Sequence, residues 1–253
     1  MVVSILILFM LIGFSGCSSK NIEPENEVVL NEYDSDDEEL DDFEDELEVE
    51  EIYDPFSGYN KTVTSFNDNV YKYFAKPVAK GYKFVLHREI RSSIGNFFQN
   101  IYFPVRFFNN LLQGKFYNAS EETGRFFINT TVGVLGLFDP AKNKFNLEAH
   151  KEDFGQTLGY YGVGSGPHIV VPLFGPSNLR DLIALAPDSL LNPVKLVDEK
   201  YYFITYLATK SIESINDTSL HINRYDKLKE DAVDLYPYLR DVYEQYRDNQ
   251  IAE

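Results

Sequence analysis

Two long stretches without charged residues constrain the fold of this 253-residue chain more than any other feature. The first covers residues 126–138 and the second covers residues 154–179. The second is about as long as a membrane-spanning helix, but six glycines and three prolines interrupt it. Each break frees backbone groups that hydrocarbon cannot hydrogen-bond, so we do not expect it to span a bilayer as one helix. The two stretches are expected to form either the core of a soluble domain or a surface that contacts lipid.

The acidic charge of the chain is concentrated in one segment. The net charge is −17, and residues 23–54 hold 18 of the 40 acidic residues and no Lys or Arg. Residues 55–253 are formally neutral, with 22 acidic and 22 basic residues. Residues 18–53 are therefore expected to be a disordered, solvated spacer, with a docking arm for a basic partner as the alternative. No basic patch stands out, which argues against nucleic acid as a partner.

The single cysteine marks the end of the N-terminal apolar segment. Residues 1–16 are too short to span a membrane and are typical of a signal peptide, and small residues precede Cys17. This junction resembles a bacterial lipobox, which implies cleavage before Cys17 and lipidation of its thiol. An ordinary membrane anchor or an unmodified thiol is the alternative. The expected organisation is a signal peptide (1–16), a lipidated N-terminus with an acidic linker (17–53) and a folded domain (54–250).

Apolar residues at helical spacing dominate the folded domain. From Asn60, an expected cap, the pattern continues to residues 73–74, and Lys76-Pro77 is expected to end that helix. Further helices are expected at residues 90–101, 104–113, 118–131, 177–185, 195–215 and 225–246, with a short helix after Asp139-Pro140, turns at Pro187 and Pro193, and a break at Pro237. Residues 169–171 are the best strand candidate. The expected fold class is all-α, built from short, broken helices.

Signals for catalysis are poor in the sequence. Val163 and Pro167 stand where a nucleophile elbow around Ser165 requires glycines. The same segment ends in proline where a dinucleotide fingerprint requires glycine. The four histidines lack zinc-ligand spacing. We therefore expect a protein that is not an enzyme and that uses no cofactor or metal.

Two arginines flank the uncharged stretches. The guanidinium groups of Arg125 and Arg180 can bind phosphate, or they can pair with Asp139, Asp153 or Asp181. The sequence leaves both alternatives open.

A series of short motifs runs from Asp54 to about Tyr246. In chain order they are Asp54-Pro-Phe, Tyr59-Asn60, Phe66-Asn-Asp68, Lys76-Pro-Val-Ala-Lys-Gly-Tyr82, Asn96-Phe-Phe98, Leu112-Gln-Gly-Lys115, Gly124-Arg-Phe-Phe-Ile-Asn-Thr130, Gly136-Leu-Phe-Asp139, Glu152-Asp-Phe-Gly-Gln-Thr-Leu-Gly159, Gly162-Val-Gly-Ser-Gly-Pro167, Pro172-Leu173, Gly175-Pro-Ser177 and Leu179-Arg-Asp181. Together they resemble the VacJ/MlaA family of outer-membrane lipoproteins. The acidic segment 23–53 lies outside this resemblance.

The resemblance implies a ring-shaped helical protein that lies in the inner leaflet of the outer membrane beside a porin trimer. Proteins of this family remove misplaced phospholipid from the outer leaflet through a channel in the ring, and they pass it to a periplasmic carrier, MlaC. Phospholipid, a porin trimer and an MlaC-like carrier are therefore the expected partners of a lipid-anchored, periplasm-facing protein. One alternative is a structural or adaptor lipoprotein that binds a porin or another envelope protein without transporting lipid. A lipid hydrolase that uses Ser165 is a third hypothesis.

The ring implied by the resemblance suggests roles for two groups of residues. Uncharged polar residues inside apolar patterns are candidates for lining the channel, with helix caps or hydrogen-bonded core amides as the alternative. They are Asn67, Asn96, Asn129, Thr130 and Thr131. The candidates for membrane contact or gating are Phe126, Phe127, Gly133, Gly136, Phe138, Gly162, Gly164 and Gly166.

Overall fold

The computed structural model describes residues 54–196 and 202–253. The expected signal peptide, Cys17 and the acidic linker lie outside the described residues. In chain order the helices are α3 (Ser57–Val70), the π-helical turn η2 (Tyr71–Ala75), α4 (Lys76–Val85), α5 (Arg88–Ile101), α6 (Phe103–Leu112), α7 (Phe116–Thr131), α8 (Pro140–Phe145), α9 (Phe154–Tyr160), α10 (Leu179–Leu191), the 3-10 helix η3 (Pro193–Leu196), α11 (Tyr202–Leu220), α12 (Arg224–Glu230) and α13 (Leu235–Ala252).

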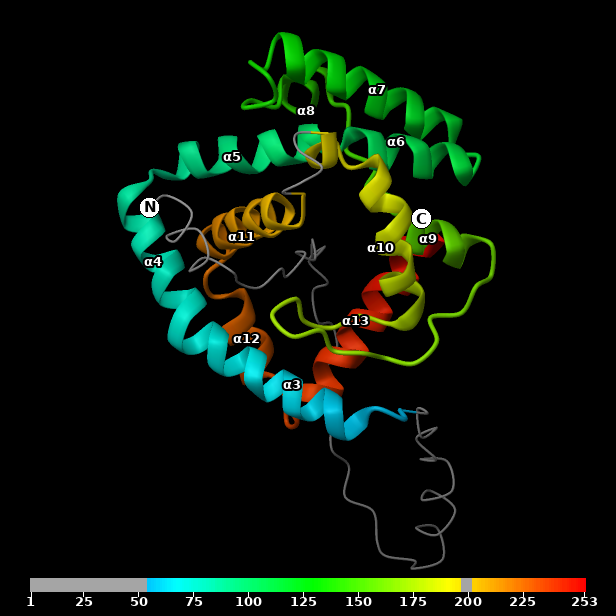
Figure 1. Ribbon diagram of the computed structural model, residues 1–253. Coiled ribbons are helices and arrows are strands. Elements are labelled where there is room, and N and C mark those ends of the chain that lie inside the picture. The colour runs from blue at the N-terminus through cyan, green and yellow to red at the C-terminus, as the bar shows by residue number, and fades with distance from the viewer. Residues whose placement is uncertain (1–53, 197–201) are drawn as a thin grey trace, which may run out of the picture.

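The helices are arranged around a ring (Figure 1). One continuous edge contains α3, η2 and α4, the next contains α5, and α6 and α7 stack against each other beside it. The chain returns through α10 and α13, and α13 contacts both α9 and α3. The helix α11 lies inside the ring and packs against α4 and α5. The expected ring-shaped, all-α fold is confirmed, and the described residues form only isolated β-bridges, at 168–178 and 171–175.

Proline, glycine and aspartate set several helix ends as the sequence predicts. The helix α6 has Pro104 in its first turn, and the chain leaves it through Gly114, whose φ of +73° is in the left-handed region. The Asp139 side chain accepts a hydrogen bond from the backbone N–H of Lys142 at 3.0 Å and thereby caps α8. Pro237 lies in the first turn of α13. These predicted boundaries are confirmed.

The predicted helix end at Lys76-Pro77 is wrong. The chain stays helical from Ser57 to Val85, and η2 connects α3 to α4. In η2 the backbone N–H of Lys76 donates to the carbonyl of Tyr71, five residues earlier. Pro77 lies where the π-helical hydrogen bonds between residues five apart give way to α-helical bonds between residues four apart. The N–H that proline lacks is therefore missing at the junction between the two patterns.

The predicted turn at Pro187 is also wrong, because Pro187 lies inside α10. Side chains on both sides of the proline hold the helix to its neighbours. Asp181 bonds to Arg247 on α13, and Asp188 accepts a hydrogen bond from Asn109 on α6. These tertiary contacts compensate for the one backbone hydrogen bond that proline removes.

Asn60 is not a helix cap but a buried link between distant segments. It is fully buried inside α3. Its Nδ2 donates to the carbonyl of His168 at 2.9 Å and lies 3.0 Å from the Tyr236 hydroxyl. Its Oδ1 accepts from the backbone N–H of Val170 at 2.8 Å. One amide therefore joins α3 to the loop before α10 and to α13.

The interior is more polar than that of an ordinary globular domain. Among the described residues, buried polar and charged side chains outnumber buried hydrophobic ones, and the hydrophobic clusters are small. The largest fully buried side chains are all polar: Glu122, Asn60, Asn109, Asn110, Asn178 and Ser219. Large hydrophobic side chains are instead exposed along the outer helices and loops. None of the described helices combines the length and hydropathy needed to cross a membrane.

The loop after α7 has an unfavourable backbone. Val134 and Leu135 have φ values of 54° and 59°, in the left-handed region that β-branched residues rarely adopt. Their side chains are exposed. The strain is therefore not offset by burial of either side chain.

We expect Val134→Gly to stabilise the protein. Glycine removes the strain of the left-handed backbone from the folded state, and it also increases the conformational entropy of the unfolded chain. The first effect should be larger, so the free energy of unfolding should rise by about 0.5–1 kcal/mol. Val132 is a matched control, because it is equally exposed but has an ordinary φ of −82°. Val132→Gly should lower the melting temperature and Val134→Gly should raise it. Shifts of the same sign would contradict this explanation.

Candidate functional site

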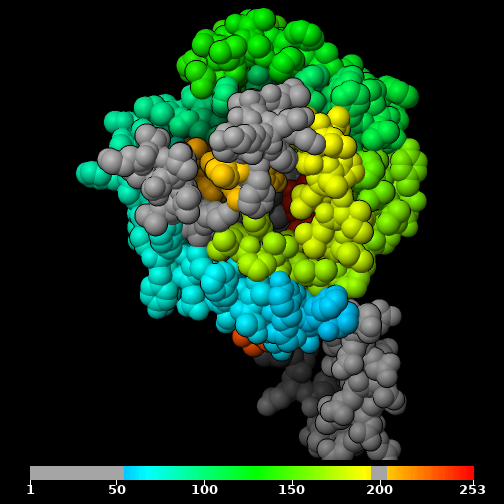
Figure 2. All heavy atoms as spheres, viewed as in Figure 1, coloured from blue at the N-terminus to red at the C-terminus, as the bar shows by residue number. Residues whose placement is uncertain are grey.

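A cavity of about 590 Å³ lies at the centre of the ring. Residues of α5 and α11 line one side of the cavity. The other side is lined by residues of α10, the first turn of α6 and the loop before α9. Figure 2 shows the surface hollowed between α11, in orange, and α10, in yellow. The cavity walls carry both signs of charge together with tyrosine, leucine and phenylalanine side chains. Such a lining suits a ligand with a polar end and an apolar end.

One face of α11 presents charged side chains to the cavity at helical spacing. The ammonium of Lys210 lies 2.9 Å from a carboxylate oxygen of Glu213 and 4.5 Å from the centre of the Tyr102 ring. The Tyr102 hydroxyl donates to the same Glu213 oxygen at 3.1 Å. Burial alone would lower the pKa of Lys210, but Glu213 and Tyr102 outweigh it and raise that pKa above its ordinary value. Lys210 is therefore a fixed positive charge on the cavity wall.

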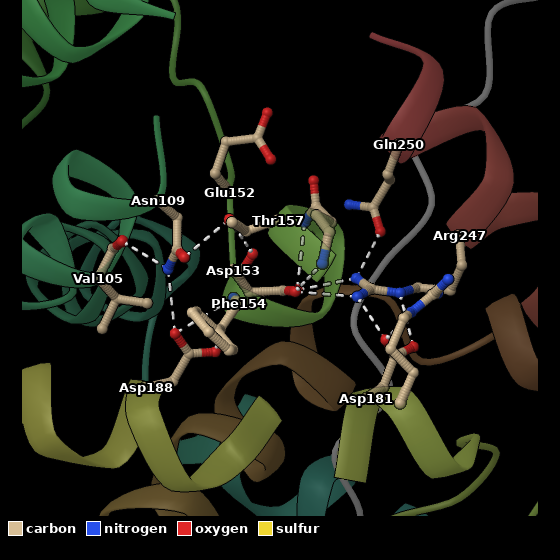
Figure 3. Close-up of polar contacts among 12 residues, drawn as sticks. Val105, Asn109, Glu152, Asp153, Phe154, Thr157, Asp181, Asp188, Arg247 and Gln250 are labelled. Carbon is tan, nitrogen blue, oxygen red and sulfur yellow. Dashed lines mark hydrogen bonds and ion pairs between the residues drawn. The ribbon is translucent and has the colours of Figure 1, made fainter. Parts of the chain in front are cut away.

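Asp188 on α10 is a carboxylate on the opposite wall. It accepts hydrogen bonds from the Asn109 side chain at 3.0 Å and from the backbone N–H of Phe154 at 3.1 and 3.2 Å (Figure 3). Both donors are uncharged, so among the residues that the structure describes no direct ion pair offsets its desolvation. Burial raises the pKa of Asp188 to about 6, with the nearby charge of Asp153 adding to the rise.

Asp188→Asn is expected to change how stability depends on pH. The folded pKa of about 6 lies above the ordinary value of the carboxyl, so Asp188 favours the folded state at low pH and loses that contribution as the pH rises through about 6. Asparagine keeps an acceptor oxygen and carries no charge. The variant should therefore melt at a higher temperature than the wild type at pH 7.5 and at nearly the same temperature at pH 4. An equal shift at both pH values would contradict the assignment.

A second polar cluster, which we call the α13 clasp, consists of Arg247, Asp153, Asp181 and Tyr243. Figure 3 shows Arg247 between Asp153 and Asp181. Arg247 contacts the Asp153 carboxylate at 2.8 and 2.9 Å and the Asp181 carboxylate at 2.8 and 3.0 Å. The Tyr243 hydroxyl donates to Asp181 at 2.7 Å. Burial opposes ionisation of Asp153, but its hydrogen bonds with Arg247 prevail and hold its pKa below the usual value. The clasp joins α13 to α10 and to the start of α9.

The structure places the predicted channel residues in different surroundings. Asn96 lines the central cavity. Asn67 is buried and bonds the backbone of the loop before α10, at the Val171 carbonyl and the Leu173 N–H. Asn129 is buried and bonds Asp139 and the N–H of Ala141, which joins α7 to α8.

The two threonines lie near the end of α7. Thr130 accepts a hydrogen bond from Asn100 at 3.0 Å, and the exposed Thr131 donates to the carbonyl of Phe127 at 2.7 Å. Asn96 and Asn129 also border a second cavity of about 10 Å³, together with Arg125. The role of all five residues in lining a channel stays a prediction.

The predicted membrane-contact residues differ in exposure. Phe127 and Phe138 are 61% and 59% exposed, whereas Phe126 is half-buried and stacks on Phe103 with ring centres 4.5 Å apart. Phe127, Val132, Val134, Leu135, Leu137 and Phe138 form an exposed apolar segment, which we call the 127–138 surface.

The predicted gating glycines fall into two groups. Gly133 and Gly136 are packed tightly, since an added Cβ would lie 2.5 Å from the Asn129 carbonyl in one case and 2.4 Å from the Asn100 Cβ in the other. Gly162, Gly164 and Gly166 are exposed, and Gly162 and Gly166 have positive φ. Their part in gating stays a prediction.

Arg125 and Arg180 are both buried and face protein carboxylates. Arg125 lies 2.8 Å from Asp139 and Arg180 lies 3.1 Å from Asp181. These pairs correspond to the second alternative that the sequence left open. Contact with phosphate stays a prediction for both.

Sequence reasoning missed the charged residues of the cavity and the α13 clasp. Lys210, Glu213 and Asp217 recur at intervals of three and four within a long aromatic helix, and this spacing is the signal that could have identified the wall of α11. Nothing in the local sequence links Arg247 to residues 153 and 181. That contact depends on closure of the ring.

Comparison with protein families identifies the chain. The family model described as MlaA lipoprotein matches residues 52–250. The chain belongs to the MlaA lipoprotein family. A protein of Rickettsia bellii (strain RML369-C) is 33% identical to it over 199 residues, which cover 78% of this chain and 76% of the relative.

Two further relatives extend the MlaA comparison. The "Intermembrane phospholipid transport system lipoprotein MlaA" of Haemophilus influenzae (strain ATCC 51907 / DSM 11121 / KW20 / Rd) is 30% identical over 205 residues, which cover 79% of this chain and 80% of the relative. A chain solved under "Structural basis for maintenance of bacterial outer membrane lipid asymmetry" has 30% identity and a TM-score of 0.67, covering 79% of this chain and 100% of its own length. The MlaA fold is thus shared over most of the described residues.

Proposed function

We propose that this protein moves phospholipid through the cavity of its ring and so maintains the lipid asymmetry of the outer membrane. Phospholipid misplaced in the outer leaflet enters the cavity and passes to a periplasmic carrier of the MlaC type. The protein is held in the inner leaflet of the outer membrane by lipid on Cys17, beside a porin trimer. Its role is transfer without bond chemistry. The names of its relatives, a phospholipid transport lipoprotein and a structure concerned with outer-membrane lipid asymmetry, support this proposal.

The observation that carries the proposal is the distribution of polar and apolar side chains, because this fold exposes many large hydrophobic side chains and buries many polar ones. The 127–138 surface and other outer positions expose large hydrophobic side chains, while the central cavity brings charged and hydroxyl side chains together with apolar ones. Acyl chains favour the outside of such a ring, and a lipid headgroup favours its inside. A core that merely stabilised a soluble adaptor would have the opposite arrangement.

Blocking the cavity tests the proposal directly. Ser189 on α10 lines the cavity, and its hydroxyl donates to the carbonyl three residues earlier at 2.7 Å. Ser120 on α7 makes the same local hydrogen bond at 2.7 Å on the outer surface. Ser189→Trp should fill part of the cavity, whereas Ser120→Trp should leave it open. The two variants thus add the same bulk to matched helical positions.

The readout is outer-leaflet phospholipid in cells that express only the variant. We expect cells with Ser189→Trp to accumulate surface phosphatidylethanolamine, detected with a membrane-impermeant amine reagent, and cells with Ser120→Trp to resemble the wild type. Full function of a folded Ser189→Trp variant would exclude transfer through this cavity. Normal asymmetry in cells lacking the protein would favour the adaptor alternative.

A further inference from the structure

The cations that line the cavity are largely matched by protein carboxylates. Arg106 lies 2.7 Å from the buried Glu122, and Lys210 lies 2.9 Å from Glu213. Lys151, in the loop before α9, is exposed at the cavity wall. Most of the positive charge in the lining is therefore already paired with a protein carboxylate. An anionic ligand would find few free cations there.

Two carboxylates of the lining, Asp188 and Asp217, are less well matched. Asp188 has only the uncharged donors of Asn109 and Phe154 within the described residues. Asp217 on α11 uses one oxygen, which lies 3.1 Å from Nδ1 of His221. Burial raises the pKa of Asp217, and the charges of His221, Arg224 and Lys151 oppose that rise. The cavity thus holds two carboxylates that can accept hydrogen bonds from an added cation.

A buried hydroxyl of the lining also lacks a partner. Ser214 is 6% exposed, and among the described residues its Oγ has no hydrogen-bond partner. It follows Glu213 on the cavity wall. An unpaired buried hydroxyl costs free energy unless a ligand or water completes it. Its position beside Lys210 and Glu213 provides a donor for a phosphate or glycerol oxygen.

We propose that the cavity preferentially takes zwitterionic phospholipids with a primary ammonium, the phosphoethanolamine class, over purely anionic phospholipids. The phosphate accepts hydrogen bonds from Ser214 and from the Lys210 ammonium, whose three N–H donors allow it to contact Glu213 and the phosphate together. The ammonium of the lipid donates to Asp188 and Asp217. This inference rests on the proposed function. A purely anionic headgroup supplies no cationic donor to either carboxylate and adds repulsion, while a quaternary choline has no N–H to donate.

Competition among lipids tests this preference. The full-length protein, purified in a neutral detergent at pH 7.5, is loaded with a phosphatidylethanolamine that carries a fluorescent acyl chain. Dihexanoyl phosphatidylethanolamine, phosphatidylglycerol and phosphatidylcholine are the competitors, with acyl-free glycerophosphoethanolamine as a fourth. We expect the ethanolamine lipid to bind about fivefold to tenfold more tightly than the glycerol lipid, the scale of the net contribution of one ordinary hydrogen bond. The acyl-free headgroup should compete weakly.

Two variants assign the preference to residues. Asp188→Asn combined with Asp217→Asn should reduce the ratio between the two lipids to about twofold or less. Asp217→Asn alone, which leaves the hydrogen bonds of Asp188 intact, should reduce it partly and serves if the double variant does not fold. Glu148→Gln is the control, because Glu148 pairs with Lys142 on the exposed surface. It should retain the wild-type ratio.

The outcomes separate the two proposals. If no phospholipid displaces the fluorescent lipid, the proposed function fails. Equal or tighter binding of phosphatidylglycerol overturns the headgroup preference and leaves lipid transfer standing. An unchanged ratio in Asp217→Asn and in the double variant rejects these carboxylates as its cause. Competition by glycerophosphoethanolamine equal to that of the lipid would identify a site for a soluble phosphate ester instead.

Discussion

Replacing Arg247 with methionine is expected to lower the free energy of unfolding by about 3–5 kcal/mol. Methionine fills much of the same volume but leaves the carboxylates of Asp153 and Asp181 without their shared cation. The Arg247 and Asp181 side chains are largely buried, and Arg247 contacts both carboxylates through two nitrogens each. Urea unfolding of the purified protein in detergent, followed by circular dichroism, measures the change.

Two comparisons make the Arg247 result specific. Arg247→Lys keeps the positive charge but cannot contact both carboxylates in the same forked geometry, so an intermediate loss is expected. Arg88→Met makes the same chemical change at an exposed position on α5 and should alter stability by less than about 0.5 kcal/mol. If Arg247→Met and Arg88→Met had similar effects, the α13 clasp would not be a major source of stability.

Asn60→Ala is expected to cost about 2–4 kcal/mol. The substitution leaves the backbone N–H of Val170 and the carbonyl of His168 buried without their partner, and it removes a contact with the Tyr236 hydroxyl. The same unfolding measurement applies. Because Asn60 joins α3 to α13, limited proteolysis should also become faster at the start of α13.

Asn69 is the matched control for Asn60. It lies on the same helix, is largely exposed and donates only to the carbonyl of Ser65 at 2.9 Å. Asn69→Ala should change stability by less than about 0.5 kcal/mol. A loss as large as that of Asn60→Ala would indicate an effect on α3 itself rather than on the contact between segments.

Both predictions concern the way α13 closes the ring. Its N-terminal end contacts α3 through Tyr236 and Asn60, and its C-terminal end is held by Arg247. The two contacts lie on opposite ends of one helix. Loss of either should loosen the ring at a different point. Combining Asn60→Ala with Arg247→Met should therefore produce the largest loss of structure.

Helix ends were predictable where a local residue determines them. Asp139 caps α8 through its own side chain, and Pro104 and Gly114 bound α6. Lys76-Pro77 and Pro187 misled the prediction because the local preference of proline is overridden there. The π-helical turn η2, just before Pro77, lets the helix continue through that proline, and contacts of Asp181 and Asp188 hold the helix around Pro187.

The central cavity was less predictable, because its walls come from segments far apart in the chain. The sequence suggested uncharged amides, and one of these, Asn96, lines the cavity. The charged lining depends on how α11 faces α10, which no local pattern specifies. Family resemblance implied a ring, but the position of Lys210 and Asp188 on facing walls required the structure.

The polar interior has a consequence for the temperature dependence of stability. Unfolding exposes apolar surface that raises the heat capacity and polar surface that lowers it. With buried side chains dominated by asparagine, serine and charged residues, the two contributions offset each other more than in an ordinary domain. The heat-capacity change per residue should therefore fall below the usual value of roughly 12–15 cal/mol/K. The curve of folding stability against temperature should accordingly be flatter, so this fold should lose less stability on cooling than a domain with a large hydrophobic core.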